Sequence, residues 1–334
     1  MDYQKYFDHE NGNRRKTITL KKLAPTSGRM KKADGDAPGG DRRDGLVYVY
    51  NEQIELAINV ALATHRPILI RGTSGSGKSS LARNVARRLK WWYYEQVVTS
   101  RTQARDLQWS FDTLRRLSDA QAKKLKPNAA YIEPGVLWWA FDPNGAARRG
   151  QQASSKLPRV ANPGIVPPKG KSTISTEPGA VVLLDEIDKA DPDVPNNLLV
   201  PLGSLQFKVI ETGLKFDVIA KRHLLVLITT NDERVLPNAF MRRCVMLRLE
   251  PPEAPQLVNI AKEHYGPDKK NIYASIADKV LALAPVGTSG KPEASAAEYL
   301  DAVRACIELG VNPESNPSAW EAIANTTLSK KAAV

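Results

Sequence analysis

The chain has 334 residues, of which 42% are hydrophobic and 25% charged, and its net charge is +12. This length suits two domains of roughly 150 residues each, and the composition is typical of a globular chain with a sizeable core. Two cysteines and four scattered histidines exclude a disulfide framework and a zinc site. Because no apolar run approaches the roughly 20 residues of a membrane helix and the N-terminus is too polar for a signal peptide, we expect a cytoplasmic protein without membrane association.

The N-terminal third of the chain starts with an arm and continues as a βαβ unit. Residues 1–44 are rich in glycine, proline, lysine and aspartate and lack apolar periodicity, which predicts a flexible basic arm. Ordered structure is expected from residue 45. The apolar run 67–70 predicts a buried strand, a glycine-rich turn follows at 72–77, and residues 80–90 predict a helix.

Further short apolar segments predict buried strands of a parallel sheet that is covered on both faces: 95–99, 180–184 and 224–230. Beyond residue 251 only helical patterns occur. The predicted fold is therefore α/β: a parallel sheet sandwiched by helices over residues 45–250, followed by a small all-α domain over 251–334.

One segment of the α/β region has an unusual composition. No acidic residue occurs between Asp142 and Glu177, whereas six lysines and arginines do, together with many prolines, glycines and serines. Long loops inside compact domains are usually functional or disordered. We therefore predict a mobile basic loop over about 143–178.

The strongest chemical signal is GTSGSGKS at residues 72–79, which matches the phosphate-binding pattern G-x-x-x-x-G-K-[S/T]. The glycines let successive backbone N–H groups surround phosphate oxygens, and the following helix adds the positive end of its dipole. Lys78 is expected to reach the β- and γ-phosphates, and the Ser79 hydroxyl to ligate Mg²⁺. The residues expected to bind the nucleotide and its metal are Gly72, Thr73, Ser74, Gly75, Ser76, Gly77, Lys78, Ser79, Ser80 and Asp185.

A second signal is the apolar run 181–184, which ends in Asp185 and Glu186. A buried strand that ends in a carboxylate delivers it to the edge of the sheet, beside the metal held by Ser79. Asp185 is expected to ligate Mg²⁺, and Glu186 to polarise an attacking water. This pair favours hydrolysis over phosphoryl transfer to a metabolite.

Two further blocks carry polar residues. Asn231 ends the strand predicted over 224–230 and could hold the attacking water or the γ-phosphate; the alternative is a turn, which Asn-Asp favours. Arg242 and Arg243 are either solvated charges or ligands of a neighbouring subunit's nucleotide. An arginine supplied in trans contributes roughly 10³ to 10⁵ in rate in the best-studied cases.

These four blocks, in this order and ahead of a helical region, resemble the AAA+ ATPases, and more narrowly their MoxR and dynein-related branch. The resemblance spans about residues 47–310. It implies a parallel sheet in the strand order 5-1-4-3-2 with a helical lid. It also implies Mg-ATP as the cofactor and a homo-oligomeric ring, usually a hexamer, with ATP at the subunit interfaces.

The same resemblance assigns roles to individual residues. Residues 72–79 become the Walker A loop, and Asp185 and Glu186 the Walker B pair. Asn231 becomes sensor 1. Arg243 becomes the arginine finger, with Arg242 as second choice.

Three other features follow from the resemblance. Residues 106–141 would hold an insertion in the second helix, and residues 206–218, which also read independently as a hairpin, an insertion before sensor 1. Ala297 stands where many relatives carry a sensor 2 arginine. Arg304 is either its substitute or an ordinary surface arginine.

The sequence is compatible with three functions. The resemblance favours a Mg-dependent, ATP-hydrolysing ring ATPase that remodels or activates a partner protein, such as a von Willebrand A-type protein. The charge and the basic segments favour a nucleic-acid-associated ATPase of a phage-defence or mobile-element system. The third function is a scaffold that binds ATP without hydrolysis, against which the complete set of hydrolytic residue types argues.

Overall fold

The computed structural model describes most of the chain, over residues 3–4, 7, 17–18, 45–169, 178–211, 216–268, 271–284 and 295–328. The chain forms two compact units. The first draws on segments 1–21, 52–70 and 85–247, and the second on segments 22–51, 71–84 and 248–334. The predicted arm over 1–44 thus lies outside the described residues, except at five positions.

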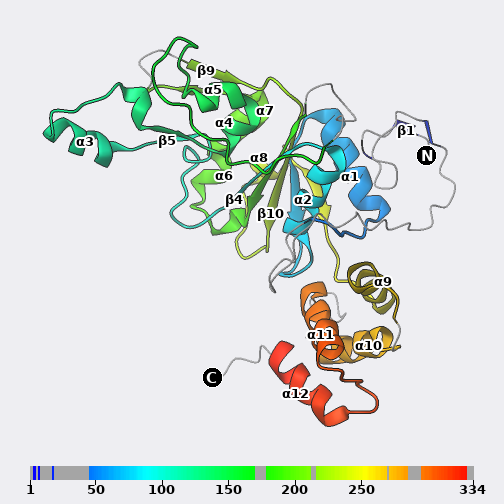
Figure 1. Cartoon of the computed structure of the whole chain (residues 1–334). Helices are drawn as coiled ribbons and strands as arrows, with labels where there is room; N and C mark the ends of the chain where they lie inside the picture. The colour runs from blue at the N-terminus through cyan, green and yellow to red at the C-terminus, as the bar shows by residue number, and fades with distance from the viewer. Residues whose placement is uncertain are drawn as a thin grey trace. The chain divides into compact units, whose positions relative to one another are not determined.

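Five strands form the central sheet, in the order β11-β3-β10-β7-β4. Figure 1 labels β10 and β4 of this sheet. The strands are β3 (Ile68–Arg71), β4 (Trp92–Val97), β7 (Ala180–Asp185), β10 (Leu224–Thr230) and β11 (Val245–Arg248). Numbered along the chain from β3, this order is 5-1-4-3-2, which confirms the order that the resemblance implies. β7 pairs in parallel with both of its neighbours, β10 and β4.

The burial of the strands follows their sequence. β7 and β10 are buried at every position, as uninterrupted apolar runs predict for strands covered on both faces. β4 begins at Trp92, three residues before its predicted start, because Tyr93 and Tyr94 are buried in the strand and aromatic residues favour strands. Helix α4 (Val136–Phe141) packs on β4 and β7, and helix α1 (Glu52–Thr64) packs against β10.

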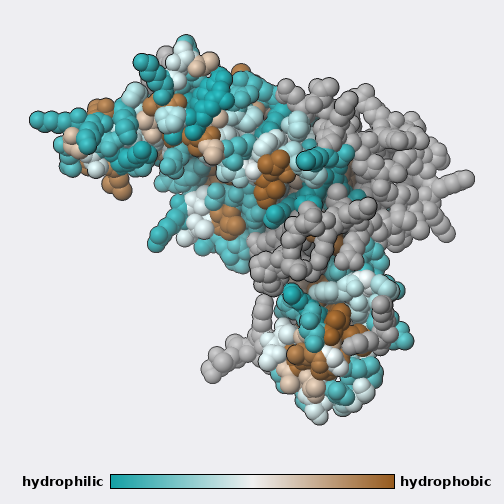
Figure 2. Space-filling view, in the orientation of Figure 1, coloured by the Kyte–Doolittle hydropathy of each residue, from teal (hydrophilic) through white to brown (hydrophobic). Residues whose placement is uncertain are grey.

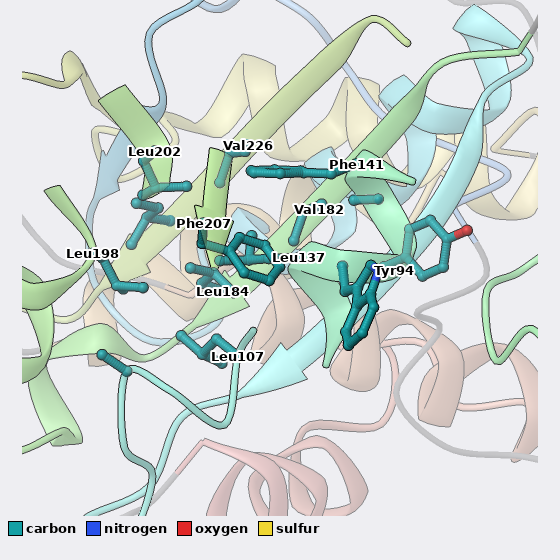
Figure 3. Close-up of a cluster of buried hydrophobic side chains, with 14 of the residues drawn as sticks. Tyr94, Leu107, Leu137, Phe141, Val182, Leu184, Leu198, Leu202, Phe207 and Val226 are labelled. Atoms are coloured by element: carbon teal, nitrogen blue, oxygen red, sulfur yellow. The ribbon is translucent and has the colours of Figure 1, made fainter. Parts of the chain in front are cut away.

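The core of the first unit joins the sheet to the predicted hairpin, which is confirmed as β8 (Gln206–Val209) paired antiparallel with β9 (Phe216–Ile219). Figure 3 shows Phe207 of β8 among side chains of the sheet and of α4. Its ring centroid lies 5.7 Å from that of Trp109 and 5.7 Å from that of Phe141. Burying such a side chain stabilises the fold by about 1.5–3 kcal/mol, so the hairpin is part of the core.

The insertion predicted over 106–141 contains a two-stranded antiparallel sheet and a helix. β5 (Trp109–Phe111) pairs antiparallel with β6 (Ile132–Pro134), and α3 (Thr113–Gln121) lies between them in sequence. Figure 1 shows α3 projecting away from the sheet beyond β5. No residue of α3 is buried, and the helix begins where the Asp112 carboxylate accepts a hydrogen bond from the backbone N–H of Arg115 at 2.8 Å.

Short helices complete the first unit: α5 (Pro143–Ala147), α6 (Asp193–Asn197), α7 (Leu199–Ser204), α8 (Asn238–Met241) and the 3₁₀ turns η1 (Asn128–Tyr131) and η2 (Ile187–Lys189). The predicted basic loop is described as far as residue 169 and includes α5. An antiparallel bridge joins Ile165 to Tyr93, and the Asn162 amide donates to the Tyr94 hydroxyl at 3.1 Å. The mobility of the basic loop stays a prediction.

In its described residues beyond 251, the C-terminal part of the second unit contains helices joined by turns and no strand, as predicted. Its helices are α9 (Ala254–Tyr265), α10 (Tyr273–Leu283), α11 (Ala296–Glu308) and α12 (Pro317–Thr327). They share one hydrophobic core, in which the buried Tyr299 hydroxyl donates to the backbone carbonyl of Tyr273 at 3.0 Å. Across the described part of the chain, no helix is both long and apolar enough to cross a bilayer.

Candidate active site

The predicted phosphate loop connects β3 to helix α2 (Lys78–Leu89). Gly75 and Gly77 have φ angles of 76° and 88°, which glycine adopts without strain. The Lys78 ammonium is almost fully buried and donates to the backbone carbonyls of Gly72 at 2.7 Å and Thr73 at 2.8 Å. The loop is thus curled around its own lysine, and it leads into the N-terminus of α2, where backbone N–H groups and the helix dipole favour an anion.

Within the second unit, the first turn of α11 contacts this loop. The Ala297 backbone N–H donates to the Gly75 carbonyl at 3.3 Å. A Cβ atom on Gly75 would lie 2.1 Å from the Ser295 hydroxyl oxygen and 3.3 Å from the Ala297 Cβ, so helix α11 packs closely on a glycine whose positive φ already favours this residue. Arg304 lies seven residues further along, about 10 Å down the helix axis. The helix therefore presents Ala297, at the predicted sensor 2 position, to the phosphate loop.

The segment before α1 supports the start of α2. The Tyr50 hydroxyl donates to the Asn84 side-chain oxygen at 2.7 Å, and the Asn84 amide donates to the Gly45 carbonyl at 2.9 Å. The Tyr48 ring lies against Gly77, where an added Cβ would be 3.4 Å from it. Burial raises the pKa of the Tyr48 hydroxyl far above its usual value, so this side chain stays neutral.

In the first unit, one hydroxyl joins both members of the predicted Walker B pair. Thr229 of β10 is fully buried, and its hydroxyl donates to the Asp185 carboxylate at 2.6 Å. The same oxygen accepts a hydrogen bond from the Glu186 backbone N–H at 2.8 Å. Sequence reasoning missed Thr229, although a polar residue near the end of an otherwise apolar strand was a usable signal.

Glu186 leaves the strand in a left-handed conformation, with φ 62° and ψ 50°. This conformation costs roughly 1–2 kcal/mol for a residue other than glycine, and such strain is concentrated at functional sites. The Glu186 carboxylate accepts a hydrogen bond from the Lys189 ammonium at 2.8 Å. This hydrogen bond, together with the charge of Glu186, raises the pKa of Lys189.

Asp188 fixes the loop that contains Asn231. Its buried carboxylate accepts hydrogen bonds from the backbone N–H groups of Asn231 at 3.1 Å and Glu233 at 3.0 Å. The chain after β10 is therefore tied to the turn after β7. Sequence reasoning also missed this role of Asp188.

The predicted site residues are distributed over both units. Residues 72–80 belong to the second unit, whereas Asp185, Glu186 and Asn231 belong to the first. The exposed Arg242 and Arg243 directly follow α8, also in the first unit.

The predicted metal ligands Ser79 and Asp185 both offer oxygen donors, which suit Mg²⁺ more than a transition metal. A serine hydroxyl and an aspartate carboxylate are hard donors of the kind that Mg²⁺ prefers, and this ion is commonly held by one or two protein oxygens plus substrate phosphates. No cluster of three or more His, Cys, Asp or Glu among the described residues could hold a metal by itself. The donor set therefore fits a nucleotide-borne Mg²⁺.

A parallel sheet with a phosphate-binding loop after one strand and an acidic pair after another defines a P-loop nucleoside triphosphatase fold. Residues 67–244 match the family model of the AAA domain of the dynein-related subfamily. Because this match spans more than half of the chain, the protein belongs to that family. Its AAA domain implies ATP binding and ATPase function, and helices α9–α12 form the helical lid of this fold.

Solved structures show similarity at low sequence identity. The Holliday junction branch migration motor RuvB of Thermotoga maritima is 14% identical with a TM-score of 0.43, covering 82% of this chain and 67% of its own. A putative ATPase of Cytophaga hutchinsonii is 14% identical with a TM-score of 0.40, covering 79% and 66%. Domain III of Thermotoga maritima DnaA is 11% identical with a TM-score of 0.41, covering 88% and 100%. These similarities assign no function, and no curated protein sequence matches significantly.

Proposed function

We propose that this protein is a Mg-dependent, ATP-hydrolysing ring ATPase that uses hydrolysis to remodel or activate a partner protein. The observation that carries the proposal is the Thr229 hydroxyl, which binds Asp185 and the backbone of Glu186 together. The hydroxyl thereby fixes Asp185, the proposed metal ligand, and the backbone of Glu186, the proposed proton acceptor, at the end of one buried strand. A hydrolase needs this pair, whereas a scaffold that only binds ATP does not need the second carboxylate.

In this proposal the residues act as the family pattern implies. The backbone of residues 72–80 and the Lys78 ammonium bind the phosphates, and Ser79 and Asp185 would hold Mg²⁺, which would neutralise phosphate charge. Glu186 accepts a proton from the attacking water. Asn231 positions that water or the γ-phosphate.

Arg243, or Arg242 in second place, is proposed to reach the ATP of a neighbouring subunit. Both side chains are exposed and so accessible to a second copy of the chain. The ring is proposed to be hexameric, with a core over 45–250 and a lid over 251–334. The proposed client is a protein, of which a von Willebrand A-type protein is one example.

Phosphate release per subunit is expected to rise with protein concentration, because a finger supplied in trans completes the site only in the ring. Steady-state assays with Mg-ATP across a range of protein concentrations measure this directly. Arg243→Ala should lower turnover at least about 1,000-fold at the highest concentration, which is the lower end of the range known for such fingers. Turnover that does not depend on concentration, or that survives this change, would show a self-contained site.

A nucleic-acid-associated ATPase is the second candidate, favoured by exposed cations on the α3 insertion. Arg115, Lys123, Lys124 and Lys126 are exposed there, and Figure 2 shows a largely hydrophilic surface over α3 with a few hydrophobic side chains. If four phosphates are contacted, affinity for duplex DNA should fall about 100-fold between 50 and 200 mM salt. Fluorescence anisotropy measures this, and a flat response would exclude the candidate. Lys123→Gln/Lys124→Gln should flatten the slope by about two phosphate contacts.

A further inference from the structure

The Arg66 side chain hydrogen-bonds to the backbone at Arg242 and Arg243, the two candidates for the proposed arginine finger. Arg66 lies just before β3 and is distant in sequence, by 176 residues from Arg242. Its Nε donates to the Arg243 carbonyl at 3.0 Å. Its Nη2 donates to the Arg242 carbonyl and, at 3.1 Å, to the Cys244 carbonyl. One guanidinium thus binds three consecutive carbonyls.

The chemistry of this contact suits arginine in particular. The three carbonyls lie in the turn between α8, which ends at Met241, and β11, and backbone carbonyls outside helices and strands need hydrogen-bond partners of another kind. A guanidinium presents several N–H donors in a rigid plane, so it can bind adjacent acceptors together. A lysine ammonium is a compact point charge on a flexible stem and cannot reproduce this planar arrangement.

The residue next to Arg66 adds a second attachment. The Val245 backbone N–H donates to the Pro67 carbonyl at 2.8 Å, where β11 begins. The backbone of residues 242–245 is therefore fixed to the start of β3 at four successive positions. The backbone at residues 242 and 243 sets the direction of their Cα–Cβ bonds, and from there both side chains extend into exposed positions.

We propose that Arg66 is a positioning residue for catalysis in trans: it holds residues 242–244 so that the finger reaches the ATP of the neighbouring subunit. This inference rests on the proposed function. A misplacement of about 1 Å at a catalytic group can cost a factor of about 100 in rate. Arg66 thus acts on the neighbour's site and not on the ATP site of its own subunit.

The first test compares single variants. Arg66→Ala is expected to lower kcat about 10- to 100-fold and to change KM for ATP less than about threefold, since the finger acts on the transition state. Arg66→Lys, which keeps the charge without the planar fork, should be intermediate. Arg101→Ala removes an exposed arginine from the turn after β4 and is the matched control, with turnover expected to match the wild type.

The second test uses mixed rings. A Lys78→Ala subunit lacks the lysine that binds phosphate, but its Arg66 and its residues 242–244 are intact. Mixed 1:1 with Arg66→Ala subunits, it should restore about a quarter of wild-type turnover, because about a quarter of sites in a randomly mixed head-to-tail ring combine an intact pocket with an intact neighbour. Arg243→Ala should recover in the same way. A Glu186→Gln and Lys78→Ala mixture should not recover, because both changes affect the pocket of their own subunit.

The outcomes separate this inference from the proposed function. Wild-type turnover by Arg66→Ala, or no recovery in a mixture where Arg243→Ala recovers, would overturn the role of Arg66 and leave the ring ATPase standing. If Arg66→Ala does not fold, Arg66→Lys in the same mixture decides the matter. If wild-type turnover is independent of concentration and Arg243→Ala is active, the proposed function fails, and this inference fails with it.

Discussion

Replacing Glu186 with glutamine is expected to lower phosphate release at least 100-fold while ATP binding stays within about threefold of the wild type. The amide keeps the size of the side chain but cannot accept a proton from water, and general base catalysis typically contributes 10²–10⁴ in rate. Glu186 lies outside the phosphate loop, so the contacts of the loop persist. Single-turnover phosphate release and titration with a fluorescent ATP analogue measure the two quantities separately.

The matched control for this change is Glu133→Gln, which alters an exposed carboxylate on β6 in the same way. It should leave both quantities unchanged. The two alternatives give different results. Wild-type protein that binds ATP without releasing phosphate would be a scaffold, whereas a Glu186→Gln protein that hydrolyses normally would assign the proton acceptor to another residue.

Much of the fold could be predicted from sequence because its signals are local. The strands β7 and β10 are covered on both faces, so burial leaves continuous apolar runs that stand out in the sequence. The phosphate loop requires glycines and a lysine within eight residues, and the structure curls those residues around Lys78. Local requirements of this kind leave patterns that a single sequence reveals.

The contacts that organise the site could not be predicted in this way. Thr229 binds Asp185 from 44 residues away, and Arg66 binds the Arg242 carbonyl from 176 residues away. Neither contact produces a periodicity or a motif, because each depends on which strands become neighbours in the sheet. The strand order from the family resemblance places β10 beside β7, but a list of apolar segments does not reveal which side chain crosses between them.

Replacing Thr229 with valine is expected to lower turnover about 10- to 100-fold and to reduce the free energy of unfolding by about 1–3 kcal/mol. Valine keeps the β-branched shape and the buried methyl group, so β10 should stay in place. It removes the donor to the Asp185 carboxylate and the acceptor for the Glu186 N–H. Loss of a partner by a buried polar group costs about 1–3 kcal/mol. Phosphate release and denaturant unfolding measure the two effects.

Thr229→Ser separates the hydroxyl from the packing of the methyl group. Serine keeps both hydrogen bonds and loses a buried methyl group, which costs about 1 kcal/mol. Its turnover should stay within about threefold of the wild type although its stability falls. If serine and valine lower turnover equally, packing at the end of β10 and not the hydroxyl controls the site. If only valine does so, the left-handed turn at Glu186 is held for catalysis by the same hydroxyl that orients Asp185.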